Sequence, residues 1–259
     1  MPVDQPALLP TNEHPSLRWI GLTGAATALQ VARAATQASG PVLLVTNDAA
    51  TAARMEEELA FFCAGAVPVY GFPGYETLPY DQFSPHPDII SQRLRTMARL
   101  PALRRGIVIV DVPTALQRLP PRTFIDGHAL SLRAGEALDL EQFRLRLTSA
   151  GYASVPQVGE PGDFAIRGSL FDVFPMGSES PLRIDLFDDV IESIRSFDAE
   201  SQRSLEKLPR LDLLPAREFS LSPEAIKDFR RRFRTRFAGD LTRMPLYRDV
   251  GEGLAPAGI

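Results

Sequence analysis

Short apolar runs alternate with amphipathic helical patterns over about the first 110 residues, and this alternation restricts the fold more than any other feature. The runs PVLLVTND (residues 41–48) and GIVIVDV (residues 106–112) are short and continuously apolar, as in strands that are buried in a parallel sheet. Apolar residues recur at helical spacing in residues 49–65 and 88–106. The sequence therefore predicts an α/β domain built on a parallel sheet.

The segment before these runs has the outline of a phosphate-binding loop. SLRWIGLTG (residues 16–24) predicts a strand followed by a turn, and GLTGAATALQVA (residues 21–32) leads into an alanine-rich helix. A phosphate loop has the pattern G-x-x-x-x-G-K-[ST] between a strand and a helix. The question is whether this loop can still bind a nucleotide.

The loop lacks the residues that bind phosphate and magnesium. Gly21 occupies the first glycine position, but Ala26, Thr27 and Ala28 replace the second glycine, the lysine and the hydroxyl residue, and Gly24 lies between them. Each lost charge-assisted hydrogen bond is worth about 1.5–3 kcal/mol. We expect this degenerate loop to be inactive, with no tight binding of ATP.

Other catalytic arrangements are weakly supported. Asp111 ends an apolar run, but Val112 follows it where a helicase-type site has a second carboxylate, so we interpret Asp111 as a solvated cap at the end of a strand. The three histidines (His14, His86 and His128) lie far apart without a second ligand at i+3 or i+4. We expect no catalytic residue, no metal site and no cofactor in this chain.

The overall composition fits a folded protein in a reducing compartment. Of 259 residues, 44% are hydrophobic and 23% charged, and the net charge of -4 gives no overall basic field for nucleic acid. The single cysteine, Cys63, excludes an internal disulfide and is expected in the core. No apolar stretch approaches the length of a membrane span or a signal peptide, so we expect a cytoplasmic protein without membrane contact.

A second domain of α+β type is predicted after the first. DLEQFRLRLTSAGY (residues 139–152) predicts a helix with Asp139 as N-cap and Gly151 as C-cap. Two strands are predicted next, at residues 163–175 and 182–189. The complete predicted division is residues 1–125, 126–218 and 219–259, the last being the truncated start of a further subdomain.

Alternation along the two predicted strands places a set of side chains on an outer sheet face. Leu182, Ile184 and Leu186 point inward, as do Phe164, Ile166 and Leu170 in the other strand. Arg167, Arg183 and Phe187 then share one exposed face. Arginine and aromatic residues are the usual anchors of protein interfaces. The alternative is that a loop covers Phe187 and that the arginines are only solvated.

A basic helix is predicted at residues 221–239, begun by Ser222 as N-cap and ended by Gly239. One stripe of this helix is aromatic, and most of the rest is arginine (Phe229, Phe233, Phe237; Arg230, Arg231, Arg232, Arg234, Arg236). We favour a buried aromatic stripe with a solvated or intramolecular docking face of arginines. Phosphate contact is the alternative.

Three long segments carry a family resemblance. They are FPGYETLPYDQFSPHPDIISQRLRTMARL (residues 72–100), SAGYASVPQVGEPGDFAIRGSLFDVFPMGSESPLRIDLFDDVIESIRSFDAESQRS (residues 149–204) and LLPAREF (residues 213–219). With them the chain resembles the N-terminal region of the bacterial transcription-repair coupling factors (Mfd), which is itself similar to the first domains of the excision-repair helicase UvrB. The degenerate phosphate loop and the short connection at YDQFSP (residues 80–85) distinguish the chain from UvrB.

The resemblance implies a non-catalytic module that binds UvrA through its second domain and so recruits it to stalled RNA polymerase for nucleotide excision repair. It assigns Arg167, Arg183 and Phe187 to the UvrA contact. It also implies masking of this surface by a C-terminal domain, and places RNA polymerase binding, DNA binding and the ATP- and magnesium-dependent translocase outside this chain. The alternative is a helicase half with weak residual nucleotide or DNA binding.

Overall fold

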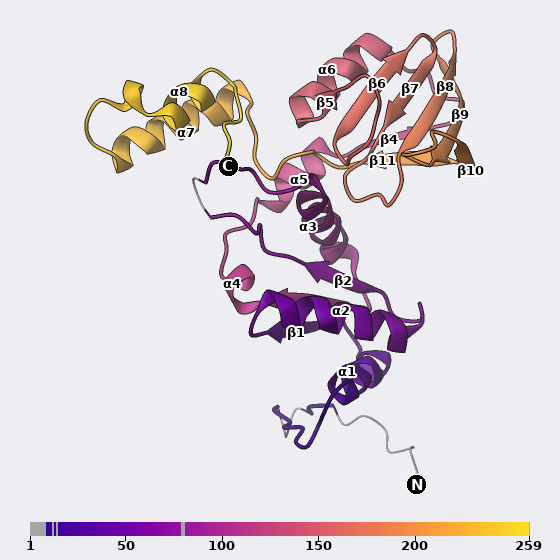
Figure 1. Cartoon of the computed structure of the whole chain (residues 1–259), viewed down its shortest axis with the longest axis vertical. Helices are drawn as coiled ribbons and strands as arrows, with labels where there is room; N and C mark the ends of the chain where they lie inside the picture. Colours follow the sequence, from indigo (N-terminus) through magenta and orange to yellow (C-terminus); the bar gives the residue numbers. More distant parts are fainter. Residues whose placement is uncertain (1–8, 12, 14, 79–80, 259) are drawn as a thin grey trace. The chain divides into compact units, whose positions relative to one another are not determined.

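The computed structural model describes residues 9–11, 13, 15–78 and 81–258 (Figure 1). The chain packs into two compact units. The first comprises Met1–Gly74 and Arg99–Arg118, and the second comprises Tyr75–Ala98 and Leu119–Ile259. These are units of packing, and the predicted boundaries after residues 125 and 218 stay predictions.

The first unit is built on a parallel sheet, as predicted. Its strands β1 (Val42–Thr46), β3 (Ile107–Asp111) and β2 (Val69–Phe72) lie in the order β1-β3-β2. Helix α1 (Ala26–Gln37) precedes β1 in the chain, and helix α2 (Ala49–Cys63) connects β1 to β2. Two short helices lie on either side of β3 in the chain, η1 (Leu100–Ala102) before it and α4 (Val112–Ala115) after it. All five residues of the central strand β3 are buried, which explains its continuously apolar sequence.

The core of this unit joins the two helices to the sheet. Its buried residues come from α1, α2, β3 and the turn before β2 (Ala28, Val31, Ala32, Ala35, Met55, Leu59, Cys63, Val67, Ile107, Ile109). Cys63 is therefore a core residue, as predicted, and burial raises the pKa of its thiol. Asp111 is not solvated as predicted: it is buried and accepts a hydrogen bond from Thr114 N at 2.7 Å, which makes it the N-cap of α4.

The strand predicted within residues 16–24 is wrong. Residues 15–25 contain neither helix nor strand. Leu17 and Ile20 are 43% and 79% exposed, so their apolar side chains do not form the buried face that a central strand needs.

The second unit contains α3 (Pro87–Arg99) up to Ala98 and a smaller α+β domain, which confirms the predicted fold class. Its six-stranded sheet has the order β10-β9-β8-β7-β6-β5, and its two-stranded sheet pairs β11 with β4. The bounds are α5 (Arg122–His128), β4 (Leu130–Arg133), α6 (Leu140–Ala150), β5 (Ala153–Ser154), β6 (Asp163–Arg167), β7 (Leu170–Val173), β8 (Leu182–Phe187), β9 (Val190–Phe197), β10 (Ser204–Leu208) and β11 (Arg210–Leu213).

Helix α6 begins and ends where the sequence predicts. Asp139 accepts a hydrogen bond from Gln142 N at 3.0 Å, and Gly151 ends the helix in the left-handed region at a φ of 99°. The ring of Phe143 packs edge-on against the ring of Phe171, with centroids 5.3 Å apart. This contact packs α6 against β7 of the six-stranded sheet.

The single strand predicted at residues 163–175 is instead a hairpin. β6 and β7 are joined by Gly168 and Ser169, and Gly168 has a φ of 63°, which favours glycine. The pairing sets Leu170 opposite Arg167. Leu170 therefore lies on the same face as Arg167, and its predicted inward position is wrong because the turn resets the alternation.

The last helices form a pair, α7 (Pro223–Arg236) and α8 (Pro245–Gly251), with η2 (Leu241–Arg243) between them. Ser222 caps α7 as predicted, but the helix stops at Arg236, three residues before Gly239. The aromatic stripe is not buried as predicted: Phe229 and Phe233 are half-buried and Phe237 is 42% exposed. Within the described ranges, none of the helices is long and apolar enough to cross a membrane.

Candidate partner-binding surface

The outer face of the six-stranded sheet has a covered end, an ionic centre and an exposed tip. At the covered end, a small cluster buries four side chains (Val158, Ala165, Phe174, Phe197). The strand pairing places Arg167 beside Leu170, and Asp172 beside Arg183, on this face. The outward position predicted for Arg167 and Arg183 is therefore observed.

Asp172 lies at the ionic centre and binds both arginines. Its carboxylate is 1% exposed and accepts hydrogen bonds from Arg183 Nε at 2.7 Å and Arg183 Nη2 at 2.9 Å. Arg167 Nη2 donates to the same carboxylate at 2.5 Å. The buried negative charge is thus balanced by two cations from neighbouring strands, which is the condition for a charge to be tolerated there.

Arg183 is held more tightly than Arg167. Its side chain is 16% exposed, its Nη1 donates to the carbonyl of Gln202 at 3.3 Å, and its guanidinium lies 4.6 Å from the centroid of the Phe197 ring. The hydrogen bonds that Arg183 donates to Asp172 raise the pKa of Arg183 above its ordinary value. The Arg167 side chain is 46% exposed, so it presents more of its charge to a partner.

Phe187 forms the exposed tip. It is 71% exposed at the end of β8, directly opposite Val190, which is 38% exposed. The tip is fixed by backbone hydrogen bonds, from Leu138 N to Asp189 O at 2.6 Å and from Ile191 N to Glu136 O at 2.9 Å. In the described part of the chain no loop buries Phe187, and its large apolar surface stays in contact with solvent.

Sequence reasoning missed Asp172, although the pattern contains a signal for it. In LFDVF, Asp172 stands between Phe171 and Val173, both of which are fully buried. A carboxylate between two inward apolar residues must face the other side of the strand. The predicted alternation missed Asp172 because it treated residues 163–175 as one strand.

The opening loop occupies the first unit and takes no part in this surface. Gly21 and Gly24 have φ values of 74° and 54°, and Ala26 is the first residue of α1. Thr27 is half-buried, while Ala28 is completely buried in the core. A side chain at position 28 therefore points into the core. Among the described residues, no group of three or more His, Cys, Asp or Glu is arranged to hold a metal ion.

Residues 130–219, which contain the whole surface, match the model of the UvrB interaction domain. The chain is also 47% identical over 238 residues to the transcription-repair-coupling factor of Escherichia coli (strain K12), covering 92% of this chain and 21% of that protein. This chain is a UvrB-like module of the transcription-repair-coupling factor family.

Further transcription-repair-coupling factors match over most of this UvrB-like module. That of Haemophilus influenzae is 40% identical over 250 residues, covering 96% of this chain and 21% of that protein. That of Staphylococcus aureus (strain Mu50) is 31% identical over 217 residues, covering 84% and 18%. The chain thus spans about a fifth of the length of the curated relatives it matches. Arg167, Arg183 and Phe187 all lie inside the UvrB interaction domain of the module.

Proposed function

We propose that this UvrB-like module recruits UvrA to stalled RNA polymerase during nucleotide excision repair, as a non-catalytic part of a transcription-repair coupling factor in the cytoplasm. The observation that carries the proposal is the exposure of Phe187, 71%, on the same sheet face as two arginines within the UvrB interaction domain. An exposed aromatic beside cationic side chains is typical of an interface anchor.

The contacts suggest different roles for the three residues. Phe187 offers apolar area, and Arg167 offers an exposed cation. Arg183 donates two of its N–H groups to Asp172. We therefore propose that Arg183 mainly stabilises the surface and contributes less to contact with the partner. A substitution of Arg183 is consequently a poor test of binding, since it also removes the main partner of a buried carboxylate.

The remaining activities are proposed for other parts of the protein. We propose that ATP and magnesium serve a DNA translocase outside this chain, and that RNA polymerase and the DNA on which the translocase acts are bound there. We also propose that a C-terminal domain masks the surface until the motor engages. The low exposure of Ala28 supports this division, because the loop cannot offer a magnesium ligand at that position.

Binding of UvrA to the 259-residue chain tests the proposal, with Phe187→Ala as the first variant. We expect the affinity to fall by at least about tenfold, as for a central aromatic anchor. Phe61→Ala is the matched control, because Phe61 is 78% exposed on α2 in the other unit. Equal affinities of Phe187→Ala and wild type, with both folded, would exclude Phe187 as an anchor.

Arg167→Ala tests the charge contact separately. Its control is Arg144→Ala, since the Arg144 side chain is 44% exposed against 46% for Arg167, and it also pairs with one carboxylate, Glu141. We expect Arg167→Ala to weaken UvrA binding more at low salt than at high salt, because the contact is electrostatic. The same loss in both variants would show that only net charge matters.

A further inference from the structure

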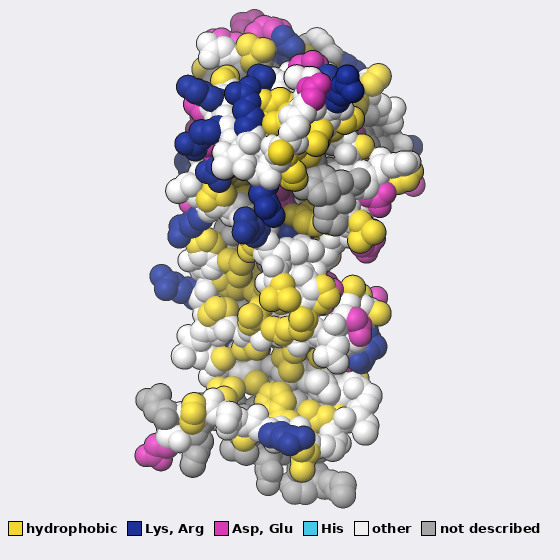
Figure 2. Space-filling view, turned by 90° about the vertical axis from the view of Figure 1, so that its left-hand side faces the viewer, with side chains coloured by type: hydrophobic (Ala, Val, Ile, Leu, Met, Phe, Trp, Pro, Cys, Tyr) yellow, Lys and Arg dark blue, Asp and Glu magenta, His cyan; other side chains and the backbone are white. Residues whose placement is uncertain are grey.

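Helix α7 concentrates positive charge in an acidic chain. It carries six cationic side chains (Lys227, Arg230, Arg231, Arg232, Arg234, Arg236) and two acidic ones (Glu224, Asp228), whereas the whole chain has a net charge of -4. All six cationic residues are exposed. Figure 2 shows Lys and Arg side chains grouped at the level of α7 and α8. Such a local patch attracts anions even when the whole chain is acidic.

The acids of the helix neutralise only some of these cations. Asp228 pairs with Arg231 and, at 2.7 Å, with Arg232 Nε. Arg230 and Arg234 form no ion pair with any carboxylate in the described part of the chain. Their charges are therefore available to a ligand.

Tyr247 on α8 holds these two arginines side by side. Its Oη accepts hydrogen bonds from Arg234 Nε at 2.8 Å and from Arg230 Nε at 3.4 Å. The guanidinium carbons lie 5.9 and 5.4 Å from the centre of its ring. Tyr247 is 4% exposed, so its position is fixed by packing. The hydrogen bond from Arg230 also lowers the pKa of Tyr247.

A neutral hydroxyl orients two cations but does not cancel their charges. Like charges at i and i+4 on a helix repel each other. The Nε atoms of Arg230 and Arg234 donate to Tyr247, and both arginine residues are exposed to solvent. An anion between or along the two guanidinium groups would relieve the repulsion and accept several N–H groups.

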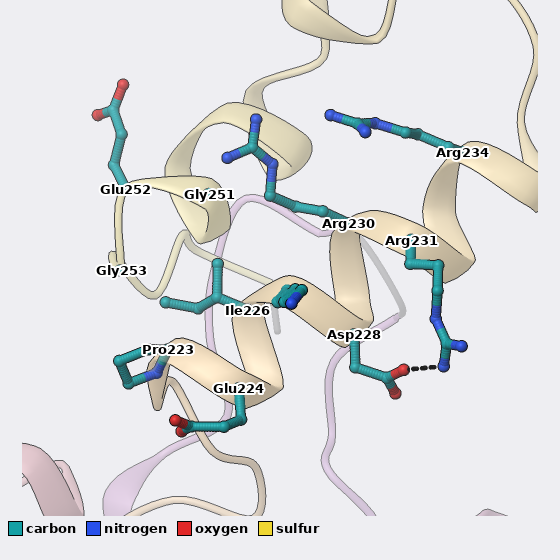
Figure 3. Close-up of a pocket in the computed structure, with 11 residues that line it drawn as sticks. Pro223, Glu224, Ile226, Asp228, Arg230, Arg231, Arg234, Gly251, Glu252 and Gly253 are labelled. Carbon is teal, nitrogen blue, oxygen red and sulfur yellow. Dashed lines mark hydrogen bonds and ion pairs between the residues drawn. The ribbon is translucent and has the colours of Figure 1, made fainter.

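The arginines border an open groove of about 1190 Å³ between α7 and the end of α8. Figure 3 shows Arg230 and Arg234 pointing to the same side of α7, while Arg231 turns toward Asp228. Lys227 also lines the groove, as do three acids (Glu224, Asp228, Glu252). Cations at positions 227, 230, 231 and 234 follow the spacing i, i+3, i+4, i+7, which is a straight row along one helix face.

We propose that Arg230 and Arg234, oriented by Tyr247, bind the phosphate backbone of a nucleic acid. A row of cations on one helix face suits a ligand with regularly spaced charges, and arginine forks match phosphate oxygens. The contact is independent of the sheet surface proposed for UvrA. It is also independent of any ATP site, because it uses no residue of the opening loop.

The test measures binding of a fluorescein-labelled DNA duplex to the 259-residue chain by anisotropy over a range of salt concentrations. In the double variant Arg230→Gln/Arg234→Gln we expect affinity at low salt to fall by about tenfold or more. The slope of log K against log salt concentration should become less negative by about 1.8, which corresponds to two lost phosphate contacts.

A matched double variant separates this site from general charge effects. Arg122→Gln/Arg210→Gln makes the same change in net charge, but both arginines lie outside α7 and pair with their own acids, Asp126 and Asp212. We expect it to leave the slope unchanged. Equal losses in the two double variants, or no salt-dependent binding by the wild type, would overturn the proposal.

Tyr247→Phe tests the orientation of the arginines without changing the charge. We expect weaker duplex binding, by about threefold, because the two guanidinium groups lose their common acceptor. Unchanged affinity would remove Tyr247 from the site. Polyglutamate serves as the competing polyanion: if it displaces the duplex at equal charge concentration, the face binds acidic protein and the assignment to nucleic acid is wrong.

Discussion

Asp172 and Arg183, on neighbouring strands β7 and β8, form a two-point ion pair with N–O distances of 2.7 and 2.9 Å around a carboxylate that is 1% exposed. The half-buried Arg183 binds Asp172 beneath the outer sheet face, and the more exposed Arg167 binds the same carboxylate from the solvent side. The surface that a partner meets therefore depends on a buried charge that the sequence-based prediction missed. Its removal has consequences for stability as well as for binding.

Arg183→Gln is expected to destabilise the β7–β8 strand pair. Loss of one partner from a buried ion pair costs about 3–5 kcal/mol of stability. Because Asp172 keeps its contact with Arg167, we expect a cost at the lower end of this range, about 3 kcal/mol. Native-state hydrogen exchange of the β7 and β8 amides measures it, because it reports the opening of this sheet separately from the other unit. Arg167→Gln is the control and should cost about 1 kcal/mol or less, since that side chain is 46% exposed. Equal effects would contradict the assigned roles.

The parts of the fold that the sequence predicts are those with local causes. Alternation within β8 correctly places Leu182, Ile184 and Leu186 inside, because the period of two needs no information about other strands. The helix caps at Asp139 and Ser222 were likewise predictable from adjacent residues.

The features that could not be predicted from the sequence depend on which strands pair with each other. Leu170 was misplaced because the turn at Gly168 reverses the chain, so its face is set by Arg167 on the other strand. Asp172 could be recognised as the common partner of two arginines only once the strand order was known. The apolar residues within 16–24 suggest a strand, yet no neighbouring strand pairs with them among the described residues.

A second buried pair joins two of the long motifs in the second unit. Arg93 Nε donates to Glu218 Oε1 at 2.6 Å, with side-chain exposures of 0% and 8%. Tyr75 Oη donates to Glu218 Oε2 at 2.7 Å, and the Arg93 guanidinium lies 4.0 Å from the centre of the Tyr75 ring. Glu218 thus connects residues 213–219, the segment that begins at the end of β11, to Tyr75 and to Arg93 on α3 through hydrogen bonds and an ion pair.

Glu218→Gln should destabilise the second unit by about 3–5 kcal/mol, because the buried Arg93 loses its counterion. Urea unfolding measures the change, provided that the m-value stays constant. The control is Glu179→Gln, since Glu179 pairs with Arg95 from an 81% exposed position and should change stability by less than about 0.5 kcal/mol. A loss for Glu218→Gln as small as that of the control would show that the pair contributes little.

Tyr75 should ionise unusually late. Burial and then the hydrogen bond to Glu218 raise the pKa of Tyr75 to about 12. Because the folded state favours the protonated phenol, its contribution to stability is fully present below the ordinary pKa of about 10 and is lost as the pH rises through about 12. Ultraviolet titration of wild type minus Tyr75→Phe isolates this group. A difference curve centred near 10 would contradict the buried hydrogen bond.

The opening loop should not bind Mg-ATP. Thr27 brings no charge to the phosphates, and Ala28 is completely buried, so no side chain is placed to hold the metal ion. Titration of a fluorescent ATP analogue, with and without magnesium, should give no saturable signal, while a protein with an intact phosphate loop serves as the positive control. Saturable, magnesium-dependent binding would instead favour the helicase-half alternative. It would place a working nucleotide site in the first unit, where we propose only a scaffold.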